Sequence, residues 1–187
     1  VSRLSFIEED SIDALERLAD RLGANKFKTT YFEKQEIGKP TGELNTKTII
    51  QSLAATLPEN VVVCTDSGGG NAAYPMCQNT TPNSWLSLTG GAIGQGGPCA
   101  VGAALACPDQ RVLAALGDGG AAYTIQALWT QARENLDVTT VIFANNSYNI
   151  LNVEYGRLGV TEVGDIAASL FDIGSPAIDW VSIGKGF

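Results

Sequence analysis

The sequence predicts an α/β fold, a three-layer sandwich in which a mainly parallel β-sheet is flanked by helices. Residues 112–148 read as strand, glycine-rich loop, helix and returning strand, which is the repeating unit of a parallel sheet. The run at residues 112–116 is apolar without alternation, as expected for a strand that is buried on both faces, and residues 138–144 form a second apolar, β-branched strand. A right-handed crossover between them places both carboxyl ends at the same edge of the sheet.

The first part of the chain has a different pattern. Residues 12–22 carry leucine and isoleucine at helical spacing behind Asp10 and Ser11, which suit an N-cap, and Gly23 ends this helix. Residues 24–42 are charged and polar and are interrupted by glycine and proline, so they predict a linker.

Apolar periodicity and the positions of glycine and proline predict the remaining elements. These are a helix at residues 46–57, strands at 60–64 and 85–88, a helix of small residues at 99–107, a helix at 121–134 with Ile125, Leu128, Trp129 and Ala132 on its apolar face, a short helix around residues 150–153, and helices at 164–171 and 176–187.

The loop after the strand at residues 112–116 holds an acidic residue, Asp118, among glycines. Glycine backbone amides and a helix N-terminus favour a phosphate or diphosphate, which a carboxylate alone would repel. A divalent cation between carboxylate and phosphate removes this conflict, and Mg²⁺ suits such oxygen ligands. Because Asn145 and Asn146 end the neighbouring strand, we expect them to face the same ligand.

Two other interpretations of this loop stay open. Residues 117–122 also fit the GxGxxA fingerprint of dinucleotide-binding folds, although asparagines stand where that fold needs an acidic residue. A glycine-rich turn without any ligand is the other possibility.

Glycine is also concentrated after two other predicted strands. Residues 66–71 form a second turn, in which Ser67 and the backbone amides of Gly68 and Gly69 are candidate diphosphate donors; a plain loop before a helix is the alternative. Residues 89–98 are so rich in glycine that we expect their backbone to lie against a ligand or another subunit. Residue type alone places Ile93 in the core.

Composition argues against several function classes. A net charge of −8 disfavours nucleic acid and anionic membrane as partners, and no apolar run is long enough to span a bilayer. The 4 cysteines show no CxxC spacing, so we expect reduced thiols in a cytoplasmic protein. Because histidine is absent, the chain cannot build a Ser-His-Asp or Cys-His nucleophile.

The GDG of residues 117–119, followed by the NN of residues 145–146, resembles the cofactor motif of thiamine-diphosphate-dependent enzymes of the acetolactate synthase and benzoylformate decarboxylase branch. The resemblance extends from about Thr46 onward. It implies that residues 44–187 form a thiamine diphosphate and Mg²⁺ binding domain, incomplete at its C-terminal side. Residues 1–43 would then be the end of a preceding domain plus a linker.

The resemblance also implies roles for individual residues. Asp118, the side chain of Asn146 and the carbonyl group of Tyr148 would hold Mg²⁺, while Asn145 would support the turn. The carbonyl group of Gly91 would bind the aminopyrimidine ring, and Ile93 would bend the cofactor. The residues expected to contact the rest of the cofactor are Ser67, Gly68, Gly69, Gly119 and Gly120.

Members of that family are lyases or transferases that decarboxylate or ligate 2-oxo acids. Their activating glutamate comes from a separate N-terminal domain, usually of a second subunit in a homodimer or homotetramer. The resemblance therefore implies a chain without catalytic residues of its own, inactive alone. A metal–diphosphate binding module without turnover is the alternative, and a Rossmann-type dinucleotide-binding domain is a third interpretation.

Overall fold

A computed structural model of the chain describes residues 5–28, 33–160 and 162–187. The chain divides into two units, residues 1–33 and Lys34–Phe187. The predicted domain boundary between residues 43 and 44 stays a prediction.

The first unit contains one long helix, α1 (Ser11–Leu22), followed by a short 3₁₀ helix, η1 (Ala24–Lys26). Both predicted ends of α1 are confirmed: the Asp10 side chain accepts the N–H of Ile12 at 2.8 Å, and Gly23 has the left-handed φ of 64°. The isoleucine and the leucines of its apolar face are exposed, and only Ala14 is buried.

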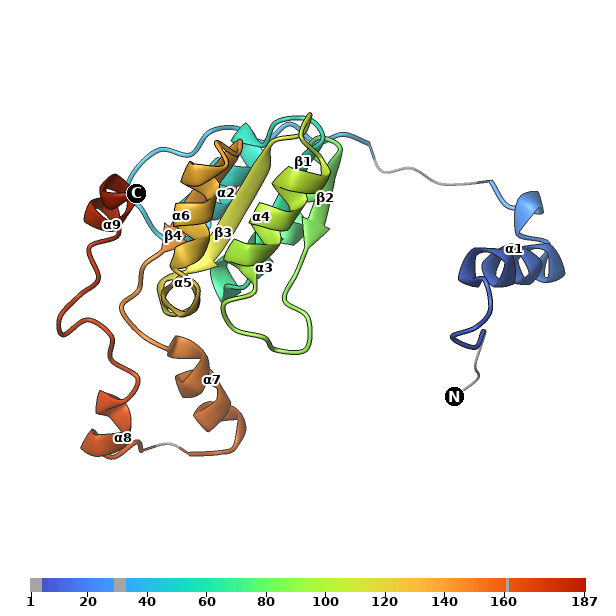
Figure 1. The fold of residues 1–187 in the computed structure, drawn as a ribbon. Coiled ribbons are helices and arrows are strands. Elements are labelled where there is room, and N and C mark those ends of the chain that lie inside the picture. The colour runs from blue at the N-terminus through green and yellow to red at the C-terminus, as the bar shows by residue number, and fades with distance from the viewer. Residues whose placement is uncertain (1–4, 29–32, 161) are drawn as a thin grey trace. The chain divides into compact units, whose positions relative to one another are not determined.

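The second unit contains the sheet and its helices (Figure 1). Its strands are β1 (Val61–Thr65), β2 (Asn83–Leu86), β3 (Val112–Gly117) and β4 (Val138–Phe143). Its helices are α2 (Thr46–Thr56), α3 (Gly68–Cys77), α4 (Gly96–Ala106), α5 (Asp118–Tyr123), α6 (Gln126–Arg133), α7 (Asn149–Arg157), α8 (Asp165–Ser169) and α9 (Trp180–Gly186).

The four strands are all parallel and lie in the order β2-β1-β3-β4. Val63 pairs with Leu113, and Gly117 pairs with Phe143. This arrangement confirms the predicted α/β fold with a parallel sheet.

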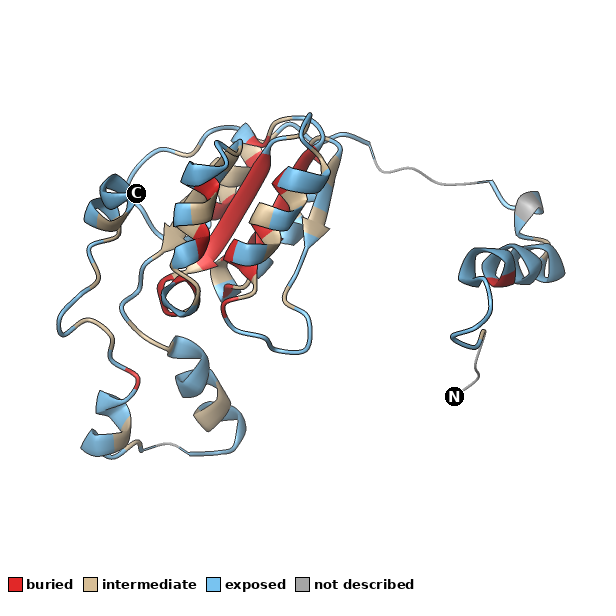
Figure 2. Ribbon diagram, viewed as in Figure 1, coloured by how far each residue is buried: buried red, intermediate tan, exposed pale blue. Residues whose placement is uncertain are grey.

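Helices cover both faces of the sheet, so the unit has three layers. In Figure 1, α4 and α6 lie in front of the strands and α2 and α3 behind them. One core joins α2 and α3 to the sheet, with Ile50, Ala54, Leu57, Ala73 and Cys77 packed on Val61, Val63 and Leu113. The other core joins α4 and α5 to the opposite face, with Ala100, Ala104 and Ala121 packed on Val62, Cys64, Val112, Ala114 and Leu116. The two central strands are consequently buried along their length (Figure 2).

The direction of the strand order changes between β1 and β3. The chain runs from β1 through α3 to β2 on one side, and from β3 through α5 and α6 to β4 on the other. In open α/β sheets the crevice at such a reversal, outside the carboxyl ends of the strands, is the usual ligand site. The loops after β1 and β3 lie on either side of this reversal.

The helix predicted at residues 121–134 is wrong in two respects. It is broken into α5 and α6 at Thr124, whose φ of −136° is not helical. The buried residues of α6 are Ala127 and Gln131, whereas Trp129 is 46% exposed and lies under the guanidinium group of Arg133. The Thr124 hydroxyl donates to the carbonyl oxygen of Gly94 at 2.8 Å, so contact with a distant segment accompanies the break.

Two other elements start earlier than predicted. Helix α4 begins at Gly96 instead of Cys99, because proline is tolerated within the first turn of a helix and Pro98 therefore does not delay its start. Strand β2 covers residues 83–86 instead of 85–88, in register with β1.

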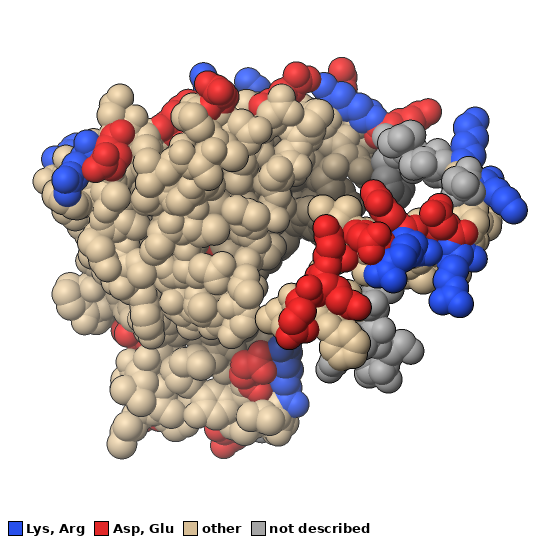
Figure 3. Space-filling view, turned by 45° about the vertical axis from the view of Figure 1, so that its right-hand side comes forward, with Lys and Arg blue, Asp and Glu red and all other residues tan. Residues whose placement is uncertain are grey.

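The charged residues of the unit Lys34–Phe187 leave a broad uncharged area on the face seen in Figure 3, where lysine, arginine, aspartate and glutamate gather at the borders. Among the helices in the described part of the chain, none has the length and apolar character that crossing a membrane requires.

Candidate functional site

Three loops meet at the carboxyl edge of the sheet, after β1, β3 and β4. The hydroxyl of Ser67, in the loop after β1, donates to the carbonyl oxygen of Ala115 in β3 at 3.3 Å. Asp118, directly after β3, accepts a hydrogen bond from Asn146 after β4 at 2.7 Å. The structure thus brings together three segments that are far apart in the sequence.

Asp118 is the first residue of α5 and is only 3% exposed. Its Oδ1 accepts the N–H of Gly119 at 2.9 Å, and its Oδ2 accepts the N–H of Asn146. The carboxylate therefore faces the asparagine turn, and each oxygen keeps lone pairs for a further partner.

No lysine or arginine neutralises this buried carboxylate within the described residues. The ion pairs found there join Arg17 to Asp13, Arg111 to Asp137, Arg133 to Glu134 and Arg157 to Glu154. A buried charge without a partner of opposite charge is costly, so this position suits a bound cation.

The asparagine turn is held in a conformation that favours its residue type. Asn146 has a φ of 54°, a left-handed value that asparagine tolerates better than most residues. The side chain of Asn145 accepts the N–H of Ser147 at 3.1 Å, in line with its expected supporting role. Asn146 also accepts the N–H of Ile173 through its carbonyl oxygen at 3.0 Å, which anchors the turn to a later segment.

Tyr148 connects the asparagine turn to the glycine loop. Its ring lies so close to Gly119 that a Cβ atom at residue 119 would overlap it. Its carbonyl oxygen accepts the N–H of Leu151 at 2.9 Å, at the start of α7, and has a second lone pair available. Glycine at position 119 is thus required by the approach of the ring.

In the loop after β1, Ser67 is the N-cap of α3. Its Oγ accepts the N–H of Gly70 at 2.8 Å, so this buried hydroxyl already makes two hydrogen bonds within the protein. Gly68 and Gly69 are the first residues of this helix, where backbone N–H groups have no partner inside the helix and favour an anion.

The glycine-rich loop between β2 and α4 carries Gly91 and Ile93. Gly91 has a φ of 74°, which is accessible to glycine, and its carbonyl oxygen accepts the N–H of Ile93 at 2.9 Å. Ile93 is 45% exposed, so the interpretation as an ordinary core isoleucine is wrong.

The oxygen atoms offered at this edge are of the kind that a hard divalent cation prefers. Among the described residues, no cluster of three or more His, Cys, Asp and Glu side chains could hold a metal. Asp118, Asn146 and Tyr148 instead offer one carboxylate, one amide and one carbonyl group, and Mg²⁺ usually takes only a few protein oxygens and completes its shell with phosphate or water.

Two residues that position the loops were not recognised in the sequence. Asp66 follows β1 and accepts the N–H of Gly96 through Oδ2 at 3.1 Å, and Thr124 binds Gly94. For Asp66 there was a signal, because it precedes a glycine run directly after a buried strand, as Asp118 does. Thr124 left no local signal, since its partner lies 30 residues away.

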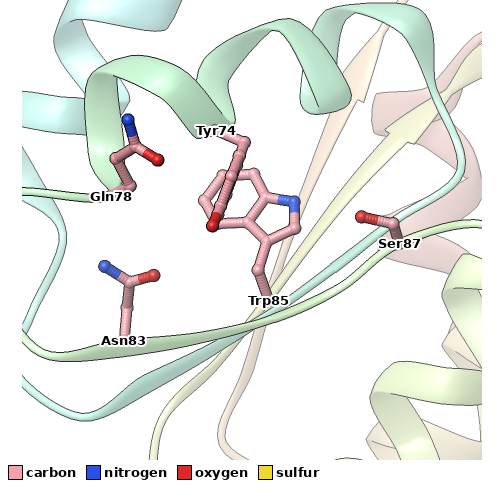
Figure 4. Close-up of a pocket in the computed structure, with 5 residues that line it drawn as sticks. All are labelled: Tyr74, Gln78, Asn83, Trp85 and Ser87. Atoms are coloured by element: carbon pink, nitrogen blue, oxygen red, sulfur yellow. The ribbon is translucent and has the colours of Figure 1, made fainter. Parts of the chain in front are cut away.

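A pocket of about 390 Å³ lies between α3 and β2 (Figure 4). It is lined by Tyr74, Gln78, Asn83, Trp85 and Ser87, and the rings of Tyr74 and Trp85 meet edge to face at 5.4 Å. None of the residues predicted for the site lines it.

Comparisons with known proteins identify the family. The family model of the thiamine pyrophosphate enzyme C-terminal TPP binding domain matches residues 67–183. An acetolactate synthase large-subunit homologue of Mycobacterium tuberculosis is 47% identical over 79% of this chain and 29% of its own length. Benzoylformate decarboxylase of Pseudomonas aeruginosa is 31% identical over 78% of this chain and 26% of its own length.

Among solved structures, the thiamine diphosphate-dependent 4-hydroxybenzoylformate decarboxylase of Rhodococcus jostii RHA1 matches with a TM-score of 0.70 and 26% identity, over 93% of this chain and 32% of that protein. The chain thus spans about a third of the relatives that it matches. Its strand order of β2-β1-β3-β4 also differs from the order 3-2-1-4-5-6 of a Rossmann fold, which argues against the dinucleotide interpretation. We conclude that the chain belongs to the thiamine pyrophosphate enzyme family and carries its C-terminal thiamine pyrophosphate (thiamine diphosphate) binding domain.

Proposed function

We propose that this domain holds thiamine diphosphate through Mg²⁺, as one half of the active site of an enzyme that decarboxylates or ligates 2-oxo acids. One observation carries the proposal: the carboxylate of Asp118 is buried without a neutralising side chain in the described structure and is aimed at the backbone of Asn146. That arrangement is unfavourable unless a cation binds there.

Each side of the proposed site has a separate task. Asp118, the side chain of Asn146 and the carbonyl group of Tyr148 hold Mg²⁺ against the diphosphate. The diphosphate would be held by Ser67, Gly68 and Gly69 after β1 and by Gly119 and Gly120 after β3. Backbone N–H groups are suited to this because they bind phosphate oxygens without adding charge or bulk.

The loop between β2 and α4 binds the other end of the cofactor. The carbonyl group of Gly91 accepts a hydrogen bond from the amino group of the aminopyrimidine ring, and Ile93 supports the bent shape of the cofactor. The exposure of Ile93 supports this role, since an apolar side chain left in solvent is available to a ligand.

When bound, thiamine diphosphate supplies the electron sink that decarboxylation of a 2-oxo acid needs. The residues of this chain bind and orient the cofactor, and we assign none of them to proton transfer. The activating glutamate, the substrate pocket and the second subunit are assigned to other parts of the complete enzyme, a lyase or transferase built as a homodimer or homotetramer.

Titration calorimetry with thiamine diphosphate tests the site. We expect the chain to bind the cofactor with MgCl₂ and much more weakly with EDTA. Asp118→Ala should reduce the affinity in MgCl₂ by at least about tenfold, because a metal ligand is lost. Asp109→Ala, which removes an exposed aspartate outside the site, is the matched control and should bind like the wild type.

Tight binding that ignores both Mg²⁺ and the Asp118 variant would contradict the metal-bridged site. The same samples should release no CO₂ from benzoylformate or pyruvate, because the activating glutamate is assigned to another domain. Turnover by the isolated chain would contradict this division of the active site.

A further inference from the structure

The glycine-rich loop at residues 89–97 is anchored by two side chains from distant parts of the fold. Asp66, after β1, accepts the N–H of Gly96 at 3.1 Å, and Thr124, between α5 and α6, donates to the carbonyl oxygen of Gly94 at 2.8 Å. One anchor therefore acts on the residue after Ile93, and the other acts on the first residue of α4.

The carboxylate of Asp66 is packed between two glycine backbones. A Cβ atom at Gly96 would lie 3.1 Å from its Cγ, and one at Gly120 would lie 3.0 Å from its Oδ1. Within the described residues, Oδ1 is buried and has no hydrogen-bond partner. Leaving one oxygen of a partly buried carboxylate without a partner is costly, while the bond of the other oxygen links the end of β1 to the first residue of α4.

Thr124 holds the loop from the end of α5. Gly94 has a φ of 87°, and a Cβ atom there would lie 2.7 Å from the Cβ of Tyr123. Only glycine allows the loop to approach the end of α5 so closely. Thr124 lies at the interruption between α5 and α6, and its hydroxyl donates to the carbonyl oxygen of Gly94.

The loop has its own internal support as well. The side chain of Gln95 accepts the N–H of Thr89 at 3.1 Å, and the carbonyl oxygen of Ala92 accepts the N–H of Gln95 at 3.1 Å. The loop is consequently a closed turn, and its two anchors set where that turn, with Gly91 and Ile93, is placed.

We propose that Asp66 and Thr124 are positioning residues that hold Gly91 and Ile93 in place for the thiamine end of the cofactor. The inference rests on the proposed function. It adds that these two residues control affinity for the thiamine part, while the diphosphate and its Mg²⁺ are bound by other groups. Loss of either anchor should thus affect one end of the cofactor and spare the other.

Calorimetry with two probes separates these ends: thiamine diphosphate and inorganic pyrophosphate, each in MgCl₂. Thr124→Val keeps the shape of threonine and removes the donor, and Asp66→Ala removes the acceptor. Each should weaken thiamine diphosphate binding about tenfold, as expected for one lost hydrogen bond of this kind, and change pyrophosphate binding less than about twofold.

The conservative variants Thr124→Ser and Asp66→Asn keep the hydroxyl donor and an acceptor oxygen, and should restore the affinity for thiamine diphosphate. Equal weakening of both probes would mean a merely structural role and would overturn the inference, as would variants that bind like the wild type. The inference would also be overturned if the wild type bound thiamine diphosphate no more tightly than pyrophosphate in MgCl₂. If the wild type binds neither probe, the proposed function itself fails, and the inference with it.

Discussion

Glycine is used at this site mainly where backbone segments touch. A Cβ atom at Gly70 would overlap the Thr65 hydroxyl and lie 2.9 Å from both the Ala115 carbonyl oxygen and the Ser67 hydroxyl. These contacts join α3 to the two central strands. The crowding is therefore part of how the loop after β1 is fixed at the sheet edge.

Gly70→Ala should destabilise the domain by about 1–3 kcal/mol, because the backbone carbonyl of Ala115 cannot move aside as a flexible side chain would. Gly102→Ala in α4 is the matched control, since a Cβ atom there meets nothing within 4 Å. That variant should gain about 0.5–1 kcal/mol from better helix propensity. Urea unfolding midpoints measure both, and a loss of similar size in the two variants would contradict the close contact at residue 70.

Among single residues, the sequence predicted those whose role can be inferred from their neighbours in the chain. Asp118 stood out because a carboxylate among glycines conflicts with a phosphate site, and the structure places it against Asn146. The role of Ser67 as the cap of α3 was not predicted, nor were the contacts of Asp66 and Thr124. These depend on which backbone groups lie nearby in space, and local patterns do not contain that information.

The helices show where tertiary contacts override a periodic pattern. The spacing of Leu128 and Trp129 predicted a continuous helix with these residues inside, yet α6 buries Ala127 and Gln131. A small residue faces α4 at position 127 because the two helices pack closely there: a Cβ atom at Gly97 would lie 3.2 Å from that of Ala127. A large apolar residue such as Trp129 does not fit this interface and lies outside it.

Helix α2 begins with a capping box, and the stability of the unit Lys34–Phe187 should depend on this cap. The Asn45 side chain accepts the N–H of Thr48 at 3.0 Å, and the Thr48 hydroxyl accepts the N–H of Asn45 at 2.9 Å. Because α2 contributes Ile50 and Ala54 to the core, its end is coupled to the whole domain.

Asn45→Ala should therefore lower the free energy of unfolding by about 1 kcal/mol, measured by urea unfolding monitored by circular dichroism. Asn45→Asp keeps a cap acceptor and adds a charge that the helix N-terminus favours, so it should stay close to the wild type. An alanine variant as stable as the aspartate variant would show that the cap contributes nothing measurable.

For the whole molecule, the parallel sheet was predictable because β1 and β3 are short, buried apolar runs, and β4 is rich in β-branched residues although it is only partly buried. The order of the strands was not, since apolar runs do not specify their neighbours. The reversal between β1 and β3, which creates the crevice, follows from helices on opposite faces and becomes visible only in the assembled sheet.

The buried thiols make a prediction about the stability of the whole fold at alkaline pH. Cys64 and Cys77 are both 0% exposed, one in each core. Burial raises the pKa of Cys77 from 9.0 to about 11, and burial together with the neighbouring Cys99 raises the pKa of Cys64 to about 12. The folded protein thus keeps both thiol protons over a range in which the unfolded chain loses them.

Stability should consequently be unaffected by these groups below pH 9.0 and should fall as the pH rises from there towards 11. The unfolded state binds fewer protons in this window, which costs about 1.4 kcal/mol per pH unit for each thiol. Urea unfolding at several pH values between about 8 and 10.5 measures the slope. A variant with both Cys64→Ala and Cys77→Ala starts from a lower stability, because it leaves small cavities, but should show a shallower alkaline slope. If the slope is the same in both proteins, other groups cause the alkaline loss, and the two thiols do not couple proton binding to folding.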